Sequence, residues 1–336
     1  MANWLQKQWQ HYSLWHLLLI PLSWLFGGIT SIRKSLYQIG WLKSVRLAVP
    51  VIIVGNINVG GTGKTPLVIW LAEQLQLAGY NPGIISRGYG GNLKGAQAVL
   101  ASSTPQQVGD EPVLIAKRSQ CPVFVSANRI EAGQALLQAH PECDVIVSDD
   151  GLQHYRLQRD VEIVVFDSLK GFGNGALLPA GPLRESQARL KTVDVIVSNG
   201  KFAGINKHLK VDGLPLTQMN LESGVFYNLS DTSKQCDASA FFNQKILAIA
   251  GIGNPERFFQ QLRHLGLNFQ ARSYDDHHPF QSQDFESAVA DIVLMTEKDA
   301  VKCHAFAKPN FWVLPVHAAI NNDLISIVLN KLNARK

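Results

Sequence analysis

The residues from Val51 to Thr65, VIIVGNINVGGTGKT, have the types and spacing that phosphate binding requires. The apolar run 51–54 predicts a buried strand, a glycine-rich loop follows, and a helix is expected over 65–78. In this context backbone N–H groups turn towards an anion, and the helix N-terminus adds partial positive charge. Lys64 would neutralise the β- and γ-phosphates, and the Thr65 hydroxyl would bind Mg²⁺. We predict a nucleotide-binding loop of Asn58, Gly60, Gly61, Thr62, Gly63, Lys64 and Thr65.

This loop departs from the general pattern at one position, because Asn58 stands where the first glycine is usual. Asparagine adopts left-handed backbone angles more readily than most residues, so we interpret the loop as a variant. The alternative is a glycine-rich turn with a chance Gly-Lys-Thr. The strand and helix expected on its two sides argue against that alternative.

A second acidic element, CDVIVSDDGLQH at 143–154, consists of an apolar strand that ends in aspartate. Such a strand end is the usual partner of a phosphate loop, since its carboxylate reaches Mg²⁺ directly or through water. Asp149 ends the strand and Asp150 follows. Asp-Asp-Gly is also a common turn sequence. Its combination with Lys64 favours the metal-binding interpretation.

Length, composition and cysteine spacing limit the classes of protein to which this chain can belong. The 336 residues are enough for two domains, and 46% hydrophobic with 17% charged residues is a globular composition. The four cysteines are scattered and form no C-x-x-C pair. This argues against a disulfide framework or a zinc site and favours a reducing compartment.

The net charge of +5 equals the charge of the first fifty residues, which contain five Lys and Arg and no acidic residue before Glu73. Trp4, Trp9, Trp15, Trp24 and Trp41 lie in the same segment. Tryptophan prefers the membrane–water boundary, and Lys and Arg favour anionic lipid head groups. We expect no nucleic-acid partner and predict contact with a membrane surface.

The stretch 14–29, LWHLLLIPLSWLFGGI, is strongly apolar but shorter than the roughly 20 residues of a spanning helix. Pro21 and Gly27-Gly28 are expected to interrupt it, and no small-residue cleavage site follows. We predict a helix that lies in the interface on the basic, cytoplasmic side. The alternative is an N-terminal helix that covers the core or forms half of a homodimer contact.

Further strands are expected at 83–86, 122–126, 143–148, 161–166 and 193–198, with a helix at 128–139. Their alternation predicts an α/β fold with a parallel sheet between helices, whose ligand lies at the carboxyl ends of the strands. We predict an N-terminal segment 1–45, a core domain 46–205, a linker 206–244 with a small β-ribbon, and a smaller α/β domain 245–336.

Eight motifs follow one another over nearly the full length: VGN at 54–56, VGGTGKTP at 59–66, SRGYG at 86–90, VGDEP at 108–112, DDGLQH at 149–154, LPAGPLRE at 178–185, DHH at 276–278 and TEKDA at 296–300. In this order they resemble the tetraacyldisaccharide 4'-kinases, the lipid A 4'-kinases. Tyr274-Asp275 stands where Phe-Pro is expected, which leaves the Asp-His pair after it intact.

The resemblance implies a P-loop kinase that uses ATP and Mg²⁺. Its acceptor would be the 4'-hydroxyl of a tetraacylated glucosamine disaccharide 1-phosphate, a lipid A precursor, at the cytoplasmic face of the inner membrane. The Asn58 departure belongs to this family's version of the loop. Two rival classes stay open: another P-loop NTPase such as a GTPase metallochaperone, and a membrane-bound nucleotide-binding scaffold without catalysis.

A sugar hydroxyl needs a base as it attacks phosphorus, and Asp110, expected in a Gly-Asp-Glu-Pro loop, is the candidate. The resemblance is what joins it to His277, which would orient it. If so, the two domains must close, which would exclude water. A surface histidine, or a metal cluster of 276–278, is the alternative for His277. Candidate Mg²⁺ ligands are Thr65, Glu111, Asp149 and Asp150, and candidate substrate contacts are Arg87, Arg129 and His154.

Thr296 to Asp299 follows an expected strand of the second domain. This segment would contact the nucleotide from across the cleft or only cap a helix. For Arg129 a structural ion pair is the alternative to a substrate contact.

Overall fold

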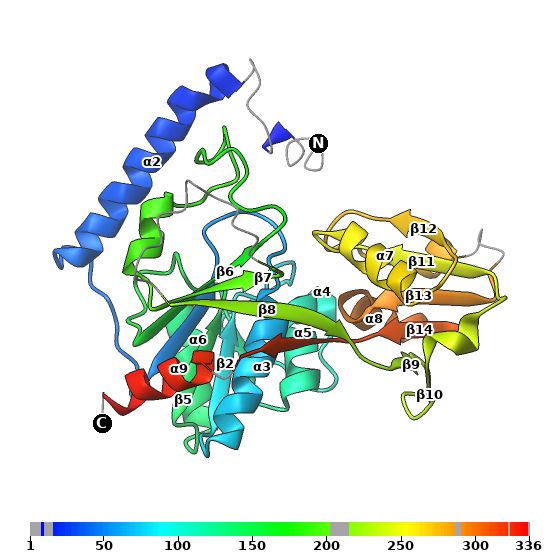
Figure 1. The fold of residues 1–336 in the computed structure, drawn as a ribbon. Coiled ribbons are helices and arrows are strands. Elements are labelled where there is room, and N and C mark those ends of the chain that lie inside the picture. Colours follow the sequence, from blue (N-terminus) through cyan, green and yellow to red (C-terminus); the bar gives the residue numbers. More distant parts are fainter. Residues whose placement is uncertain (1–7, 10–15, 202–214, 286–289, 322, 335–336) are drawn as a thin grey trace.

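The structure is a computed structural model that describes residues 8–9, 16–201, 215–285, 290–321 and 323–334. Two sheets dominate it, one of nine strands and one of six. Figure 1 shows the large sheet with its helices below the N-terminal helix and the smaller sheet beside it.

The large sheet has the strand order β15-β8-β7-β6-β1-β5-β2-β4-β3, and its six central strands are parallel. The predicted strands are confirmed to within two residues, because near-continuous apolar runs form strands that are buried on both faces. The central strands are β1 (Val51–Gly55), β2 (Pro82–Ser86), β4 (Val123–Val125), β5 (Val145–Asp149), β6 (Val161–Asp167) and β7 (Val195–Asn199), and the outer ones are β3 (Gln97–Ala98), β8 (Leu216–Ser223) and β15 (Val316–Ile320).

Apolar clusters cover both faces of this sheet. One face packs against α3 (Lys64–Leu77), α5 (Asp110–Ser119) and α9 (Asp323–Asn333), and the other against α6 (Arg129–Ala139) and the 3₁₀ helix η1 (Gln187–Thr192). The short helix α4 (Pro105–Val108) precedes α5. The arrangement is the expected parallel sheet between helices.

The smaller unit carries the six-stranded sheet, ordered β10-β9-β14-β13-β11-β12, with its own apolar clusters. Its strands are β9 (Phe226–Asn228), β10 (Gln235–Cys236), β11 (Ile246–Ala250), β12 (Gln270–Ser273), β13 (Ile292–Thr296) and β14 (Phe311–Leu314). Its helices are α7 (Pro255–His264) and α8 (Glu297–Cys303), with the 3₁₀ helices η2 (Ala238–Phe241), η3 (Ser282–Phe285) and η4 (His304–Phe306).

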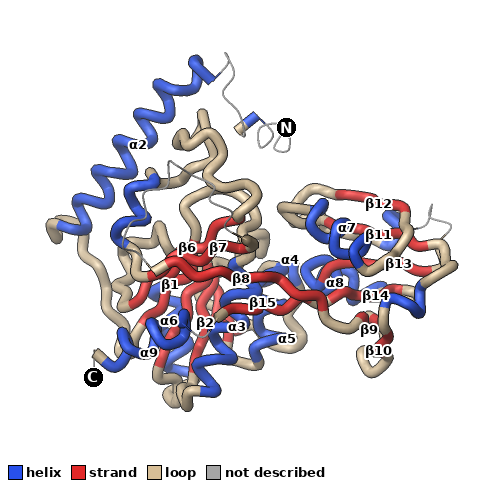
Figure 2. Tube along the Cα trace, viewed as in Figure 1, coloured by secondary structure: helices blue, strands red, loops and turns tan. Residues whose placement is uncertain are grey.

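The predicted domain boundaries differ from this arrangement at both ends of the smaller unit. Strand β8, inside the predicted linker 206–244, joins the large sheet, while β9 and β10 from the same segment join the smaller one. After β14 the chain returns, so that β15 pairs with β8 and α9 packs on the large sheet. Figure 2 shows β8 and β15 as a two-stranded connection between the units. Which of the two sheets a strand joins depends on long-range pairing, and a local sequence pattern does not specify that pairing.

The N-terminal helix α2 (His16–Gln38) runs for 23 residues without the interruption expected at Pro21 and Gly27-Gly28. Pro21 lies in the second turn, and Gly27 packs so closely on Leu177 that a Cβ would lie 2.6 Å from its side chain. Close packing offsets the helix cost of glycine, about 1 kcal/mol. Among the described residues α2 alone is long and apolar enough to span a membrane, by length and composition.

Candidate active site

A cleft of about 1070 Å³ lies between the two units and extends to α2. Its walls are the loop before α3, the start of α5, the ends of β5 and β13, the loop after β11 and the inner side of α2. One continuous space therefore joins the predicted phosphate-binding loop to the N-terminal helix.

The glycine loop has the geometry of an anion cradle. Gly60 and Gly63 have φ values of 109° and 93°, which favour glycine. Gly63 is further required because a Cβ there would overlap the Asn199 amide, which donates to the Thr62 carbonyl at 3.0 Å. Lys64 opens α3 and lies 3.3 Å from an Asp150 oxygen. Residues 60–65 all line the cleft.

Asn58 has a different position from the one predicted. It is buried, does not line the cleft, and its φ is not positive. The loop is extended here: Val59 N–H donates to the Pro182 carbonyl at 2.8 Å, and Arg184 N–H donates to the Ile57 carbonyl at 2.7 Å. The left-handed conformation assumed for Asn58 was wrong, because pairing with 182–184 straightens the chain.

Asp149 and Asp150 end β5 beside the loop but have different surroundings. Asp149 is buried and accepts a hydrogen bond from Ser86 at 3.0 Å, while its Oδ1 has no partner among the described residues. Burial and the nearby Glu111 carboxylate raise the pKa of Asp149 to about 7. For Asp150, burial is outweighed by Lys64 and Arg184, which hold its pKa at about 2.

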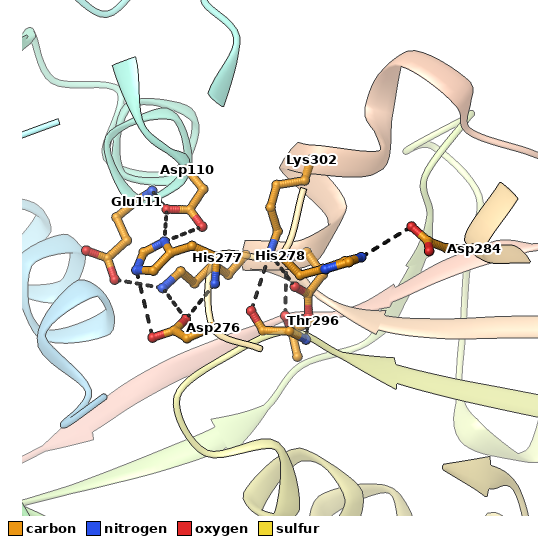
Figure 3. Close-up of polar contacts among 11 residues, drawn as sticks. Asp110, Glu111, Asp276, His277, His278, Asp284, Thr296 and Lys302 are labelled. Carbon is orange, nitrogen blue, oxygen red and sulfur yellow. Dashed lines mark hydrogen bonds and ion pairs between the residues drawn. The ribbon is translucent and has the colours of Figure 1, made fainter. Parts of the chain in front are cut away.

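Asp110 and His277 come together across the cleft, as Figure 3 shows. Asp110 begins α5 and is buried, and His277 Nδ1 lies 3.0 Å from both its carboxylate oxygens. The hydrogen bond to Asp110 raises the pKa of His277. Burial alone would raise the pKa of Asp110, but His277 and Lys298 hold it below its usual value. The pair favours a deprotonated carboxylate oriented by the imidazole.

Next to this pair Lys298 Nζ lies 3.0 Å from Glu111 and 3.1 Å from Asp276. Thr296 caps α8 by accepting from the Asp299 N–H at 3.2 Å, so the segment both caps a helix and faces the cleft. His278 points away and contacts Asp284 at 3.3 Å. Residues 276–278 therefore diverge and do not converge on one metal position.

The three residues predicted to contact the substrate do not all lie in the cleft. Arg87 lines the cleft, whereas Arg129 and His154 do not. Arg129 is 3% exposed and donates to the carbonyls of Ser126 and Asp149, at 3.2 and 2.9 Å. The substrate role predicted for Arg129 does not fit this geometry, because its donors hold the backbone at the end of β5.

His154 is half-buried, and its Nε2 finds no hydrogen-bond partner within the described part of the chain. Burial and surrounding arginines lower the pKa of His154 to about 4. Its ring is therefore neutral at physiological pH, and it does not line the cleft.

Sequence reasoning gave no site role to several residues that line the cleft, namely Tyr89, Arg184 and Gly253, together with Arg33 and Lys34 of α2. Asp276 and Lys298 also line it, and they belong to segments 276–278 and 296–299, for which the sequence left a site role open. Arg184 lay within a motif, LPAGPLRE, but its contact with Asp150 at 3.2 Å depends on the pairing of 182–184 with the loop. No local signal identifies such a contact.

A glycine loop that shares one cleft with His277, the partner of the Asp110 carboxylate, is the arrangement expected of a P-loop kinase. The family model for tetraacyldisaccharide-1-P 4'-kinase matches residues 15–333. The chain belongs to this family, which confirms the resemblance found in its motifs.

Relatives named tetraacyldisaccharide 4'-kinase agree over the whole length. That of Methylobacillus flagellatus is 49% identical over 98% of this chain and 96% of its own, and that of Dechloromonas aromatica is 46% identical over 100% and 99%. A crystal structure of LpxK from Aquifex aeolicus in complex with ATP superposes with a TM-score of 0.79, at 30% identity over 95% of this chain and 100% of that one.

Proposed function

We propose that this chain transfers the γ-phosphate of ATP to the 4'-hydroxyl of a tetraacylated glucosamine disaccharide 1-phosphate. The observation that carries the proposal is the Asp110–His277 pair: His277 lines the same cleft as the phosphate-binding loop, and the buried Asp110 lies 3.0 Å from its Nδ1. The family supplies the identity of the acceptor. The cleft's extension to α2 supplies room for a lipid to enter.

Asp110 acts as the base that accepts the proton of the attacking hydroxyl. It is buried at the start of α5, and His277 holds it through Nδ1 at 3.0 Å. General-base assistance of this kind contributes typically 10²–10⁴-fold. Because phosphoryl transfer depends mostly on positioning and charge, Lys64 and Arg87 would hold the phosphates.

The residues around Asp149 fit Mg²⁺. Its buried Oδ1 lacks a protein partner among the described residues, and Thr65 and Glu111 line the same cleft. No group of three or more His, Cys, Asp or Glu suited to a metal occurs in the described ranges, but Mg²⁺ commonly needs only one or two carboxylates beside phosphates. Bound there, Mg²⁺ would neutralise charge on the transferring phosphate. Asp150 would act mainly by holding Lys64.

Transfer of radiolabelled phosphate from [γ-³²P]ATP to a disaccharide lipid acceptor tests this function. We expect labelled lipid with wild type, and about 10²–10⁴-fold less with Asp110→Asn or His277→Ala, while an ATP analogue still binds. GTP is the comparison donor. Equal turnover of both variants and wild type would remove the pair from the mechanism, and transfer from GTP alone would indicate another class of P-loop enzyme.

The second part of the proposal is that α2 holds the enzyme on the cytoplasmic face of the inner membrane. Its outer side exposes large apolar side chains, including Leu18 at 78% and Leu25 at 61%. With the basic residues of the first fifty, this is the composition of an interfacial helix. The same helix lines the cleft with Phe26 and Thr30, so the acceptor would reach the site directly from the lipid.

Vesicle flotation tests this attachment. Leu18→Glu with Leu25→Glu should reduce the fraction that floats with anionic vesicles, because a buried carboxylate opposes insertion. Leu77→Glu is the matched control, since Leu77 is 81% exposed but lies on α3. Deletion of residues 1–40 should reduce the floating fraction further than the double substitution does. Unchanged flotation of the double variant and the deletion would contradict the attachment.

A further inference from the structure

We propose that Lys298 is a positioning residue that joins the loop carrying His277 to the helix carrying Asp110. The inference rests on the proposed function, since it concerns the same pair. Lys298 would keep the carboxylate and the imidazole in the arrangement that phosphoryl transfer uses.

Two sets of contacts link the units here, and Figure 3 labels Asp110 and His277 of the first and the carboxylates Glu111 and Asp276 of the second. In the first, Asp110 meets His277 at 3.0 Å. In the second, Lys298 Nζ bridges the two chain neighbours of that pair, Glu111 at 3.0 Å and Asp276 at 3.1 Å. Because each residue of the pair is adjacent to a residue that Lys298 holds, movement at either end would disturb the first link.

The loop around His277 needs such a link. His277 has a φ of 63°, a conformation that is rare for residues other than glycine and costs about 1–3 kcal/mol. It persists only where surrounding contacts hold it. The His277 N–H donates a hydrogen bond to the Asp276 carboxylate at 3.1 Å, and Lys298 contacts that same carboxylate.

Lys298 is itself held firmly. Its side chain is 15% exposed and stands in the first turn of α8. Behind it, Lys302 and Asp299 form a buried ion pair at 2.8 Å. Asp299 also accepts from Gly251 N–H at 3.0 Å, so α8 is tied to the end of β11. Lys298 is thus presented on a rigid element, as a positioning group requires.

The alternative role for Lys298 is direct contact with the phosphates, since it faces the cleft. The two roles predict different results. A phosphate contact would change nucleotide affinity and leave the Asp110–His277 hydrogen bond intact. A positioning residue would leave affinity almost unchanged and disturb that hydrogen bond.

The experiment compares Lys298→Met and Lys298→Arg with Lys308→Met, a control at an exposed lysine of the same unit. Turnover, the KM for ATP, binding of a non-hydrolysable ATP analogue and the NMR resonance of the His277 ring proton are measured. That resonance is assigned by its loss in His277→Gln.

We expect Lys298→Met to lower kcat by about 10²-fold, the cost of a displacement near 1 Å. The analogue's Kd should stay within about threefold, well under the tenfold step that 1.4 kcal/mol represents. The His277 resonance should shift or disappear. Lys298→Arg should restore most of kcat and most of the His277 resonance, because arginine can keep both carboxylate contacts.

An unchanged His277 resonance with unchanged kcat would overturn the proposal, as would weaker analogue binding with the resonance intact. An equally large decrease of kcat in Lys308→Met would also overturn the proposal. Failure of the proposed function is distinguishable, because it would appear as absent lipid phosphorylation by wild type while the resonance still reports on Lys298.

Discussion

Asp149 and Asp150 are adjacent carboxylates that the tertiary structure gives opposite properties. Burial raises the pKa of Asp149 to about 7, with repulsion from Glu111 and Asp150 adding to it, while Lys64 and Arg184 hold that of Asp150 at about 2 despite burial. The environment thus assigns separate roles to two identical side chains. Asp149 keeps an oxygen without a partner among the described residues, and Asp150 lies 3.3 Å from Lys64.

At the residue scale, Arg129 should act on stability rather than on substrate binding. Arg129→Met would leave buried carbonyls at 126, 149 and 150 without their donor. We expect a loss of about 3 kcal/mol in the free energy of unfolding, measured with urea. Arg156→Met, at an exposed arginine, should change it by less than about 0.5 kcal/mol. A raised acceptor KM with unchanged stability would restore the substrate role.

His154 should make the fold acid-sensitive. Its pKa is about 4 in the folded protein, below the ordinary 6.5, so the unfolded chain takes up a proton first as the pH falls. The stability it contributes is present above pH 6.5 and is lost as the pH falls towards 4. Between pH 7.5 and 5.5 wild type should lose about 1 kcal/mol more than His154→Gln, since partial exposure reduces the full linkage of ~1.4 kcal/mol per pH unit.

The control for this comparison is His264→Gln, at an exposed histidine. It should lose as much stability as wild type over the same range in urea unfolding. Equal slopes for wild type and His154→Gln would show that the ring is not held neutral.

At the scale of elements, α2 is attached to the core by small residues on one side. Ser23 Oγ donates to the Leu177 carbonyl at 2.8 Å and accepts from the Ala180 N–H at 2.9 Å, and Gly27 lies against Leu177. The opposite side is apolar and exposed. The small residues let the helix approach the loop 177–180, whose Leu177 and Leu178 line the cleft.

The adjacent glycines of α2 provide a matched pair. A Cβ at Gly27 would lie 2.6 Å from a Leu177 atom, whereas one at Gly28 meets nothing within 4 Å. Gly27→Val should therefore displace α2 and raise the KM for the lipid acceptor by about tenfold, the equivalent of 1.4 kcal/mol, with little change in the KM for ATP. Gly28→Val should leave the KM for the acceptor and the KM for ATP near their wild-type values. The same acceptor KM in both variants would place the acceptor elsewhere.

At the scale of the whole molecule, contacts across the cleft hold the two units together on both sides of the nucleotide loop. On one side His277 and Lys298 reach α5. On the other, Lys170 donates to the Gly253 carbonyl at 3.0 Å, and Arg257 lies 3.5 Å from Asp167. The β8–β15 connection joins the same units through paired strands. The active arrangement therefore depends on how closely the units approach.

Gly253 sets that approach, because a Cβ there would lie 2.8 Å from the Gly61 backbone nitrogen. Gly253→Val should hold the units apart and lower kcat/KM for ATP by about tenfold or more. Spin labels at Lys94→Cys and Lys308→Cys, in a Cys236→Ser background, should report a longer distance than in the labelled parent. An unchanged distance between the labels together with unchanged kinetics would mean that the loop around Gly61 moves aside without a measurable free-energy cost.

Local patterns identified much of this molecule. Apolar runs and glycines placed the central strands, and the glycine loop with Lys64 was recognisable because strand, loop and helix are adjacent in the chain. Asp110 was placed in a loop, although it begins α5. The ordered motifs led to the correct family. These features depend on neighbours in sequence, which a pattern records.

The tertiary structure decided most of the contacts between distant residues. Asp110 and His277 lie 167 positions apart, and before the structure only the family resemblance joined them. That β15 returns to the large sheet, and that Arg129 donates to backbone carbonyls, appeared only in the structure. Each of these outcomes depends on burial and on packing between elements. Chain closure over such separations is governed by the whole fold, so neither the partner of a side chain nor the sheet of a strand is contained in the residues beside it.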